Sequence, residues 1–187
     1  MTTEGEILGR VVEILDRLAV PYMVTGSIAT SYHGRPRATH DADVVIDPTA
    51  AQLDALVAAL DRAGFHVNPG GAREALRLRS QFNVIEMTRA TKIDLIIRKA
   101  RAFSIAEFDR RQRVDLPFAR GVAVITAEDA IVSKLDWARR TGDGERHIRD
   151  AVGVLEINPG IDRSYVAHWA ERLGLTDLWE RLTRTIP

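Results

Sequence analysis

Apolar positions in the first third of the chain alternate between helical spacing and short β-prone runs. Ile7, Val11, Ile14 and Leu18 recur at the interval of one helical turn, and Pro21 ends that pattern. A compact apolar run then stops at Gly26, a second one stops at Asp47-Pro48, and Thr49 is placed to cap the helix after it. The pattern predicts helices over 6–18, 28–33 and 49–64, and strands over 22–25 and 42–46.

The remainder of the chain changes from strands to helices near residue 125. Runs rich in branched apolar residues predict strands over 82–87, 93–97, 113–116 and 122–125. Helical periodicity predicts only helices after that, over 126–140, 145–156, 162–173 and 176–185. We therefore expect an α+β domain over residues 1–125, with a small mixed sheet and flanking helices, and a helical segment over 126–187. The tryptophans of that segment are expected in its core: Trp137, Trp169 and Trp179.

Composition excludes several classes of protein. The 187 residues carry 26 basic and 26 acidic side chains, so a generic polycation that coats nucleic acid is excluded. Binding specific to DNA is not expected. There is no cysteine, which excludes disulfides, thiolate catalysis and Cys-ligated zinc. No apolar run approaches a membrane span, and the acidic N-terminus lacks the plan of a signal peptide. A cytoplasmic protein without a membrane partner is expected.

The neutral total conceals an uneven distribution of charge. Residues 1–60 hold eight acidic and four basic side chains, whereas residues 89–120 hold nine basic and four acidic ones. A local basic surface therefore remains possible in the second segment, beside a local acidic one in the first.

Two aspartates in an apolar strand carry the most informative chemistry. Asp41 and Asp43 are two residues apart, so in a strand they would point to the same face. Two neighbouring carboxylates repel each other, and Asp is disfavoured in strands, but a divalent cation removes the conflict. Asp94 is similarly embedded in the apolar run 93–97. If the two strands are neighbours, these three carboxylates form a ligand set for two-metal chemistry with Mg²⁺, or with Mn²⁺ in its place.

The turn before these aspartates suits a phosphate group. Gly26 allows a close backbone approach, and Ser27 adds a hydroxyl at the start of a short helix whose N–H groups are free. A Gly-Ser turn alone is weak support, because it is also an ordinary helix cap.

The whole constellation resembles a known superfamily. Gly26-Ser27, a thirteen-residue spacer, Asp41-Ala-Asp43 before an apolar strand, and a later strand aspartate resemble nucleotidyltransferases of the DNA polymerase β type. The stretch from Thr25 to Asp43 is most similar to the minimal bacterial branch, which includes AbiEii-like toxin nucleotidyltransferases and small antibiotic nucleotidyltransferases. The resemblance covers about residues 20–100 and implies transfer of NMP from a metal-bound NTP to an acceptor hydroxyl.

The resemblance also assigns roles to side chains. Asp41, Asp43 and Asp94 would hold the metals, and Asp94 would help to deprotonate the acceptor. The triphosphate would contact residues around the turn and on a later helix: Gly26, Ser27, Arg37, Thr39 and Lys134. A downstream pair, Arg149-Asp150, matches the AbiEii-like pattern more weakly.

Two of these assignments have ordinary alternatives. Lys134 lies at the edge of its helix's apolar stripe, so it could reach a cleft or extend along the surface into solvent. Asp150 lies roughly opposite the stripe of Ile148, Val152 and Leu155, which favours a solvent-facing position.

The acceptor is left open between several classes. The toxin resemblance implies RNA, especially a tRNA 3′ end, with a cognate antitoxin as partner and the basic stretch 98–120 as a phosphate-binding surface. The alternatives are an aminoglycoside or lincosamide antibiotic, AMP or phosphate transfer to a protein, and a non-catalytic nucleotide-binding module of the same fold.

Overall fold

The alternation of residues 42–46 gives a strand whose two faces differ in burial. The computed structural model describes residues 3–37, 41–141 and 144–184. In strand β2 (Ala42–Ile46), Ala42, Val44 and Ile46 are buried, whereas Asp43 and Val45 on the other face are partly exposed. The period of two in the sequence thus places the apolar side chains in the core and Asp43 on the opposite face.

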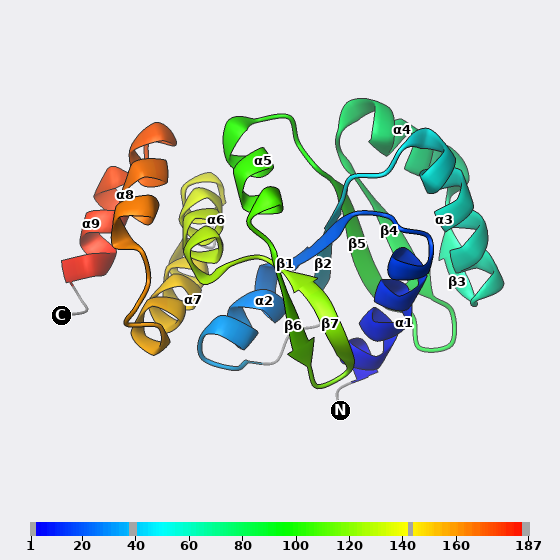
Figure 1. Cartoon of the computed structure of the whole chain (residues 1–187), viewed down its shortest axis with the longest axis horizontal. Coiled ribbons are helices and arrows are strands. Elements are labelled where there is room, and N and C mark those ends of the chain that lie inside the picture. Colours follow the sequence, from blue (N-terminus) through cyan, green and yellow to red (C-terminus); the bar gives the residue numbers. More distant parts are fainter. Residues whose placement is uncertain (1–2, 38–40, 142–143, 185–187) are drawn as a thin grey trace. The chain divides into compact units, whose positions relative to one another are not determined.

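In the described part of the chain, seven strands form one mixed sheet in the order β3-β4-β5-β2-β1-β7-β6 (Figure 1). Parallel pairing joins β2 to β5 and β1 to β7, and the other neighbours are antiparallel. The strand that follows β1 in the chain, β2, therefore lies between β1 and β5 in the middle of the sheet. Besides β2, the strands are β1 (Tyr22–Thr25), β3 (Phe65–Val67), β4 (Gln81–Glu86), β5 (Thr91–Ile97), β6 (Gln112–Leu116) and β7 (Ala119–Val124).

The helices begin at the caps that the sequence indicates. Thr49 accepts a hydrogen bond from the Gln52 backbone in a complete capping box, and Thr126 caps its helix through Asp129. Within residues 3–37, 41–141 and 144–184, no helix is both long and apolar enough to cross a bilayer. The helices are α1 (Thr3–Arg17), α2 (Gly26–His33), α3 (Ala50–Arg62), α4 (Pro69–Leu78), α5 (Ala102–Asp109), α6 (Ala127–Arg140), α7 (Gly144–Ile157), α8 (Arg163–Arg172) and α9 (Thr176–Arg184).

The chain packs as two compact units. The strand unit comprises residues 1–25 and 39–124 and contains the whole sheet with α1, α3, α4 and α5. The helical unit comprises residues 26–38 and 125–187, so α2 packs with the C-terminal helices α6 and α7 rather than with the strands that flank it in sequence. Domains at 1–125 and 126–187 stay a prediction.

The periodicity of the sequence does not predict three of the elements. β3 has only three residues, α4 begins with Pro69-Gly70-Gly71, and α5 lies inside the basic stretch. The start of α4 is stabilised by Asn68, whose side chain accepts from the Gly71 N–H, so a tripeptide typical of a turn becomes the first turn of a helix. The four strands predicted after residue 64 correspond to β4, β5, β6 and β7, but β3 and α4 precede them and α5 separates β5 from β6.

Gly34 is required by a close backbone contact inside the helical unit. A Cβ atom at Gly34 would lie 2.8 Å from the carbonyl carbon of Gly153 and 2.8 Å from the backbone nitrogen of Val154 on α7. Backbone atoms cannot swing aside as a flexible side chain can, so the C-terminal end of α2 approaches α7 only with glycine at this position.

Replacing Gly34 with alanine is therefore expected to destabilise the protein by about 1–3 kcal/mol, the range found when a packed interior is overfilled. Urea unfolding measures the change. Gly160→Ala is the matched control in the same unit, because nothing lies within 4 Å of the Cβ it would add. Equal stability of the two variants would contradict the packing described for α2 and α7.

Candidate functional site

The carboxylates of the strand unit meet across the parallel pair β2–β5. Asp43 is directly paired with Asp94 in the strand register, so the two side chains share one face of the sheet. Asp94 is buried at 9% exposure and Asp43 is partly exposed. Asp41 immediately precedes β2, whose bounds match the predicted strand 42–46, and it is exposed. The strand geometry that was to place Asp41 and Asp43 on one face therefore applies to Asp43 alone. The adjacency of the two strands, on which the site hypothesis depended, is confirmed.

The two oxygens of Asp94 differ in their surroundings. Oδ2 accepts a hydrogen bond from the Lys92 ammonium at 3.1 Å. Oδ1 is buried and has no hydrogen-bond partner among the described residues. A buried carboxylate oxygen without a donor is costly, so this oxygen is available to a ligand that supplies positive charge.

Lys92 belongs to the same charged group, although the sequence analysis did not identify it. The hydrogen bond to Asp94 raises the pKa of Lys92, and the negative charges of Asp41 and Asp43 add to that effect. Its position two residues before Asp94 in a strand, and therefore on the same face, is the signal that could have found it.

The chemistry of these residues fits a divalent cation. Carboxylate oxygens are the donors that Mg²⁺ prefers, and Asp43 and Asp94 provide them side by side. Among the described residues, however, no group of three or more His, Cys, Asp or Glu side chains is arranged around a common point that could hold a metal ion. Metal ligation by Asp41, Asp43 and Asp94 stays a prediction.

The Gly26-Ser27 turn opens helix α2. Gly26 has a φ of +64°, a left-handed conformation that glycine adopts without strain. Ser27 lies inside the first turn of the helix rather than before it, is buried at 7% exposure, and accepts a hydrogen bond from Arg37 at 2.5 Å. Thr39 lies outside the described residues, so its predicted contact with the nucleotide stays a prediction.

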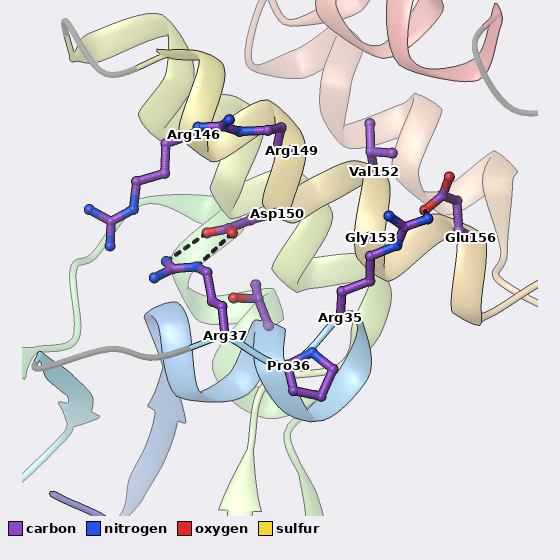
Figure 2. A pocket seen from close by; sticks show the side chains of 10 residues that line it. Arg35, Pro36, Arg37, Arg146, Arg149, Asp150, Val152, Gly153 and Glu156 are labelled. Atoms are coloured by element: carbon purple, nitrogen blue, oxygen red, sulfur yellow. Dashed lines mark hydrogen bonds and ion pairs between the residues drawn. The ribbon is translucent and has the colours of Figure 1, made fainter.

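Arg37 and Asp150 form a two-point ion pair in the helical unit. The Arg37 Nε donates to Oδ1 of Asp150 at 2.9 Å, and Nη2 donates to Oδ2 at 3.0 Å (Figure 2). This fork geometry is the strong form of an arginine–carboxylate contact. The Arg37 side chain is 27% exposed and that of Asp150 is 8% exposed, so the pair is largely withdrawn from water.

The predicted solvent-facing position of Asp150 is wrong. Helix α7 packs against both α2 and α6, so more than one side of the helix is buried. The buried residues include Ala151, Val154 and Leu155. Ile148 and Val152, which the periodicity placed on the buried stripe, are only partly buried. A second helix on the polar side of α7 is what covers Asp150, and the periodicity of α7 alone contains no information about that neighbour.

Lys134 completes the cluster from α6. Its ammonium donates to Oδ2 of Asp150 at 2.7 Å, and its side chain is 7% exposed. A lysine that extends along the surface into solvent is therefore excluded. Burial by itself raises the pKa of Asp150, but the hydrogen bonds from Arg37 and Lys134 outweigh it and hold that pKa below its ordinary value. Ser27, Arg37, Asp150 and Lys134 are thus one connected network, whereas Arg149 is exposed beside it.

A buried histidine on α2 gives the helical unit a dependence on pH. His33 is 6% exposed, and its Nε2–H donates to the Ile125 carbonyl at 2.7 Å. Burial lowers the pKa of His33 below its ordinary 6.5, against the opposing effects of that hydrogen bond and of Glu128. The folded state thus holds the neutral ring at a pH where the unfolded chain already takes up a proton.

Stability is therefore expected to fall by about 1 kcal/mol as the pH decreases from 7.5 to 5.5, because the unfolded state binds the extra proton below about pH 6.5. Urea unfolding at the two pH values measures this loss. His33→Gln should reduce the difference, whereas the variant at exposed His66, His66→Gln, should keep the wild-type difference. A wild-type slope retained in His33→Gln would show that another group is responsible.

The fold is similar to that of several solved nucleotidyltransferase structures. The crystal structure of ANT(2'')-Ia with adenylyl-2''-tobramycin aligns over 92% of this chain and 98% of its own, at 15% identity and a TM-score of 0.63. A nucleotidyltransferase-like protein from Paracoccidioides brasiliensis aligns over 96% and 92%, at 16% identity and a TM-score of 0.59. The lincosamide antibiotic adenylyltransferase LnuA, bound to lincomycin, aligns over 82% and 98%, at 12% identity and a TM-score of 0.53.

The likeness is one of structure rather than of sequence. No protein-family model matches the chain, and no curated protein matches its sequence. The chain has the α+β fold of these nucleotidyltransferases, and the fold class that the sequence predicts is confirmed.

Proposed function

We propose that the protein is a metal-dependent nucleotidyltransferase. The observation that carries the proposal is the direct pairing of Asp43 with Asp94 across β2 and β5, with a buried Asp94 oxygen that lacks a donor. The Lys92 ammonium offsets one of the negative charges, but the buried oxygen without a donor still costs stability unless a divalent cation binds. The pair on a nucleotidyltransferase fold therefore supports catalysis and argues against a module that only binds a partner.

In the proposed reaction an acceptor hydroxyl attacks the α-phosphorus of an NTP. A bond forms between the acceptor oxygen and this phosphorus, the bond from the phosphorus to the oxygen that bridges to the β-phosphate breaks, and pyrophosphate leaves. Asp41, Asp43 and Asp94 hold the divalent ion, and Asp94 takes up the hydroxyl proton. A bound Mg²⁺ or Mn²⁺ supplies charge neutralisation at the phosphates and acidifies the attacking hydroxyl.

The triphosphate is assigned to the network at the start of α2. Gly26 and Ser27 present backbone and hydroxyl groups at the N-terminus of that helix, where anions are favoured. Arg37 and Lys134 bring two positive charges against the one negative charge of Asp150, so the network keeps a net positive charge for phosphate. Thr39 is assigned to the same ligand from its sequence position alone.

For the acceptor we propose RNA, with a tRNA 3′ end as the specific target, in an AbiEii-like toxin that has a cognate antitoxin. Support comes from the sequence resemblance and from the four arginines that line a cavity in the helical unit. A second candidate is a small antibiotic, because two proteins of similar fold were solved with adenylyl-tobramycin and with lincomycin.

An acceptor panel tests the proposal. The protein is incubated with each α-labelled NTP and Mg²⁺ or Mn²⁺, and in turn with total tRNA, with aminoglycosides and lincosamides, and without acceptor. Label on tRNA alone supports the RNA assignment, and label on an antibiotic alone replaces RNA by the second candidate. No label with any acceptor, despite metal-dependent NTP binding, would favour a non-catalytic module.

A further inference from the structure

A cavity of about 470 Å³ opens in the helical unit between the segment after α2 and one face of α7. Four of its lining side chains are arginines: Arg35, Arg37, Arg146 and Arg149. Figure 2 shows Arg146 extending from α7 toward the segment that carries Arg37. Arg146, Arg149, Asp150 and Gly153 recur at helical spacing, so this face of α7 extends for about 10 Å.

The charge of the lining favours an anion. Its four arginines face two carboxylates, Asp150 and Glu156, which leaves a formal charge of +2. Both carboxylates are already engaged, Asp150 with Arg37 and Glu156 with Arg35 at 2.9 Å. Lys134, which does not line the cavity but contacts the lining residue Asp150, adds a further positive charge nearby. A concave surface with a net positive charge concentrates anionic ligands, and it repels a polycationic aminoglycoside.

An exposed tryptophan contacts the N-terminal end of the same helix through a partly buried histidine. Trp137, on the last turns of α6, stacks on His147 with ring centroids 6.4 Å apart and an interplanar angle of 25°. Trp137 is 53% exposed, so its predicted place in the core is wrong, whereas Trp179 is buried as expected. His147 follows Arg146 in the first turn of α7, so Trp137 of α6 stacks on a residue next in sequence to one of the cavity arginines. Aromatic faces beside cationic side chains are typical of surfaces that bind single-stranded nucleic acid.

The basic stretch 98–120 is less suited to this role. Arg98 pairs with Asp47 at 2.8 Å, Arg113 pairs with Asp16 at 3.0 Å, and the Arg111 guanidinium lies 4.2 Å from the centre of the Phe108 ring. These arginines serve contacts within the strand unit. In the helical unit, by contrast, the arginines line a cavity with room for a phosphate group beside them.

We infer that the arginine-lined cavity binds the backbone phosphates of a single-stranded polynucleotide, and that Trp137 stacks on one of its bases. The inference rests on the proposed function, because it names where the acceptor is held. The residues that would hold the polynucleotide include Arg146, Arg149 and Trp137, none of which is among the predicted triphosphate contacts.

The test measures binding without catalysis, so that its failure is distinct from failure of the proposed activity. Fluorescence anisotropy follows a labelled single-stranded RNA 12-mer in EDTA, without NTP, at several salt concentrations. Three variants are compared with the wild type: the double variant Arg146→Gln/Arg149→Gln, Trp137→Ala, and the control Arg163→Gln at an exposed arginine on α8.

The expected result is about tenfold or weaker binding by the double variant, with a smaller salt slope, because two phosphate contacts are lost. Trp137→Ala should weaken binding without changing the salt slope, and Arg163→Gln should bind like the wild type. Equal affinity and slope in the wild type and the double variant would overturn the inference. It would also be overturned if inorganic pyrophosphate bound in an arginine-dependent manner while the RNA did not.

Discussion

Replacing Asp43 and Asp94 with asparagine is expected to abolish nucleotidyl transfer while the fold is retained. Loss of the carboxylate charge removes both the ligands for the divalent ion and the group proposed to take up the hydroxyl proton. We expect the rate of label transfer by Asp43→Asn/Asp94→Asn to fall about a thousandfold or more. Removal of a single hydrogen-bond donor to a transition state typically lowers the rate about 100- to 1000-fold, and here two groups are lost.

The same variant is expected to be as stable as the wild type or more stable, because like charges paired across two strands repel each other. Thermal unfolding measures this second readout. Asp54→Asn is the matched control in the strand unit, since that side chain is 54% exposed on α3 and pairs only with surface Arg73 in the contacts described. An active double variant, or an inactive one that has unfolded, would contradict the assigned role.

Asp150→Ala is expected to cause the largest loss of stability in the helical unit, about 3–5 kcal/mol. Asp150 is the shared partner of Arg37 and Lys134, so its removal leaves the ammonium of Lys134 buried without a counter-charge. Breaking a buried ion pair from one side typically has an effect of this size.

Lys134→Met should cost less than Asp150→Ala, because Arg37 still holds the Asp150 carboxylate by two hydrogen bonds after that change. Urea unfolding ranks the two variants. Glu171→Gln at an exposed position on α8 serves as control and should stay within about 0.5 kcal/mol of the wild type. The reverse order, or equal small effects, would mean that Asp150 is not the organising charge of the network.

Local signals predicted those parts of the fold that depend on their own residues. Thr49 and Thr126 begin helices because their side chains cap the nearest backbone N–H groups, and a sequence displays such caps directly. The alternation around Asp43 likewise fixed which face of β2 is buried. Helix α5 was missed because Phe103 and Phe108 are buried by neighbours that its short, weakly periodic sequence does not reveal.

For the candidate site, too, the sequence predicts the local structure around a residue but not its contacts with distant segments. That Asp43 and Asp94 belong to strands follows from the apolar residues around them, but their direct pairing depends on the register of β2 and β5. The burial of Asp150 and Lys134 depends on α2 joining the C-terminal helices, a contact between segments far apart in the chain. Lys92 was overlooked because an isolated lysine before a strand aspartate is ordinary in sequence and gains meaning only from its 3.1 Å contact.

The central claim is that the bond broken in the NTP lies between the α- and β-phosphates. The most direct measurement incubates the protein and tRNA with Mg²⁺ and the same NTP labelled either at the α- or at the γ-phosphate. The account predicts that α-label becomes attached to the acceptor, that γ-label is released as pyrophosphate, and that EDTA prevents both. Transfer of γ-label to the acceptor, or release of labelled inorganic phosphate with no α-label transferred, would contradict it.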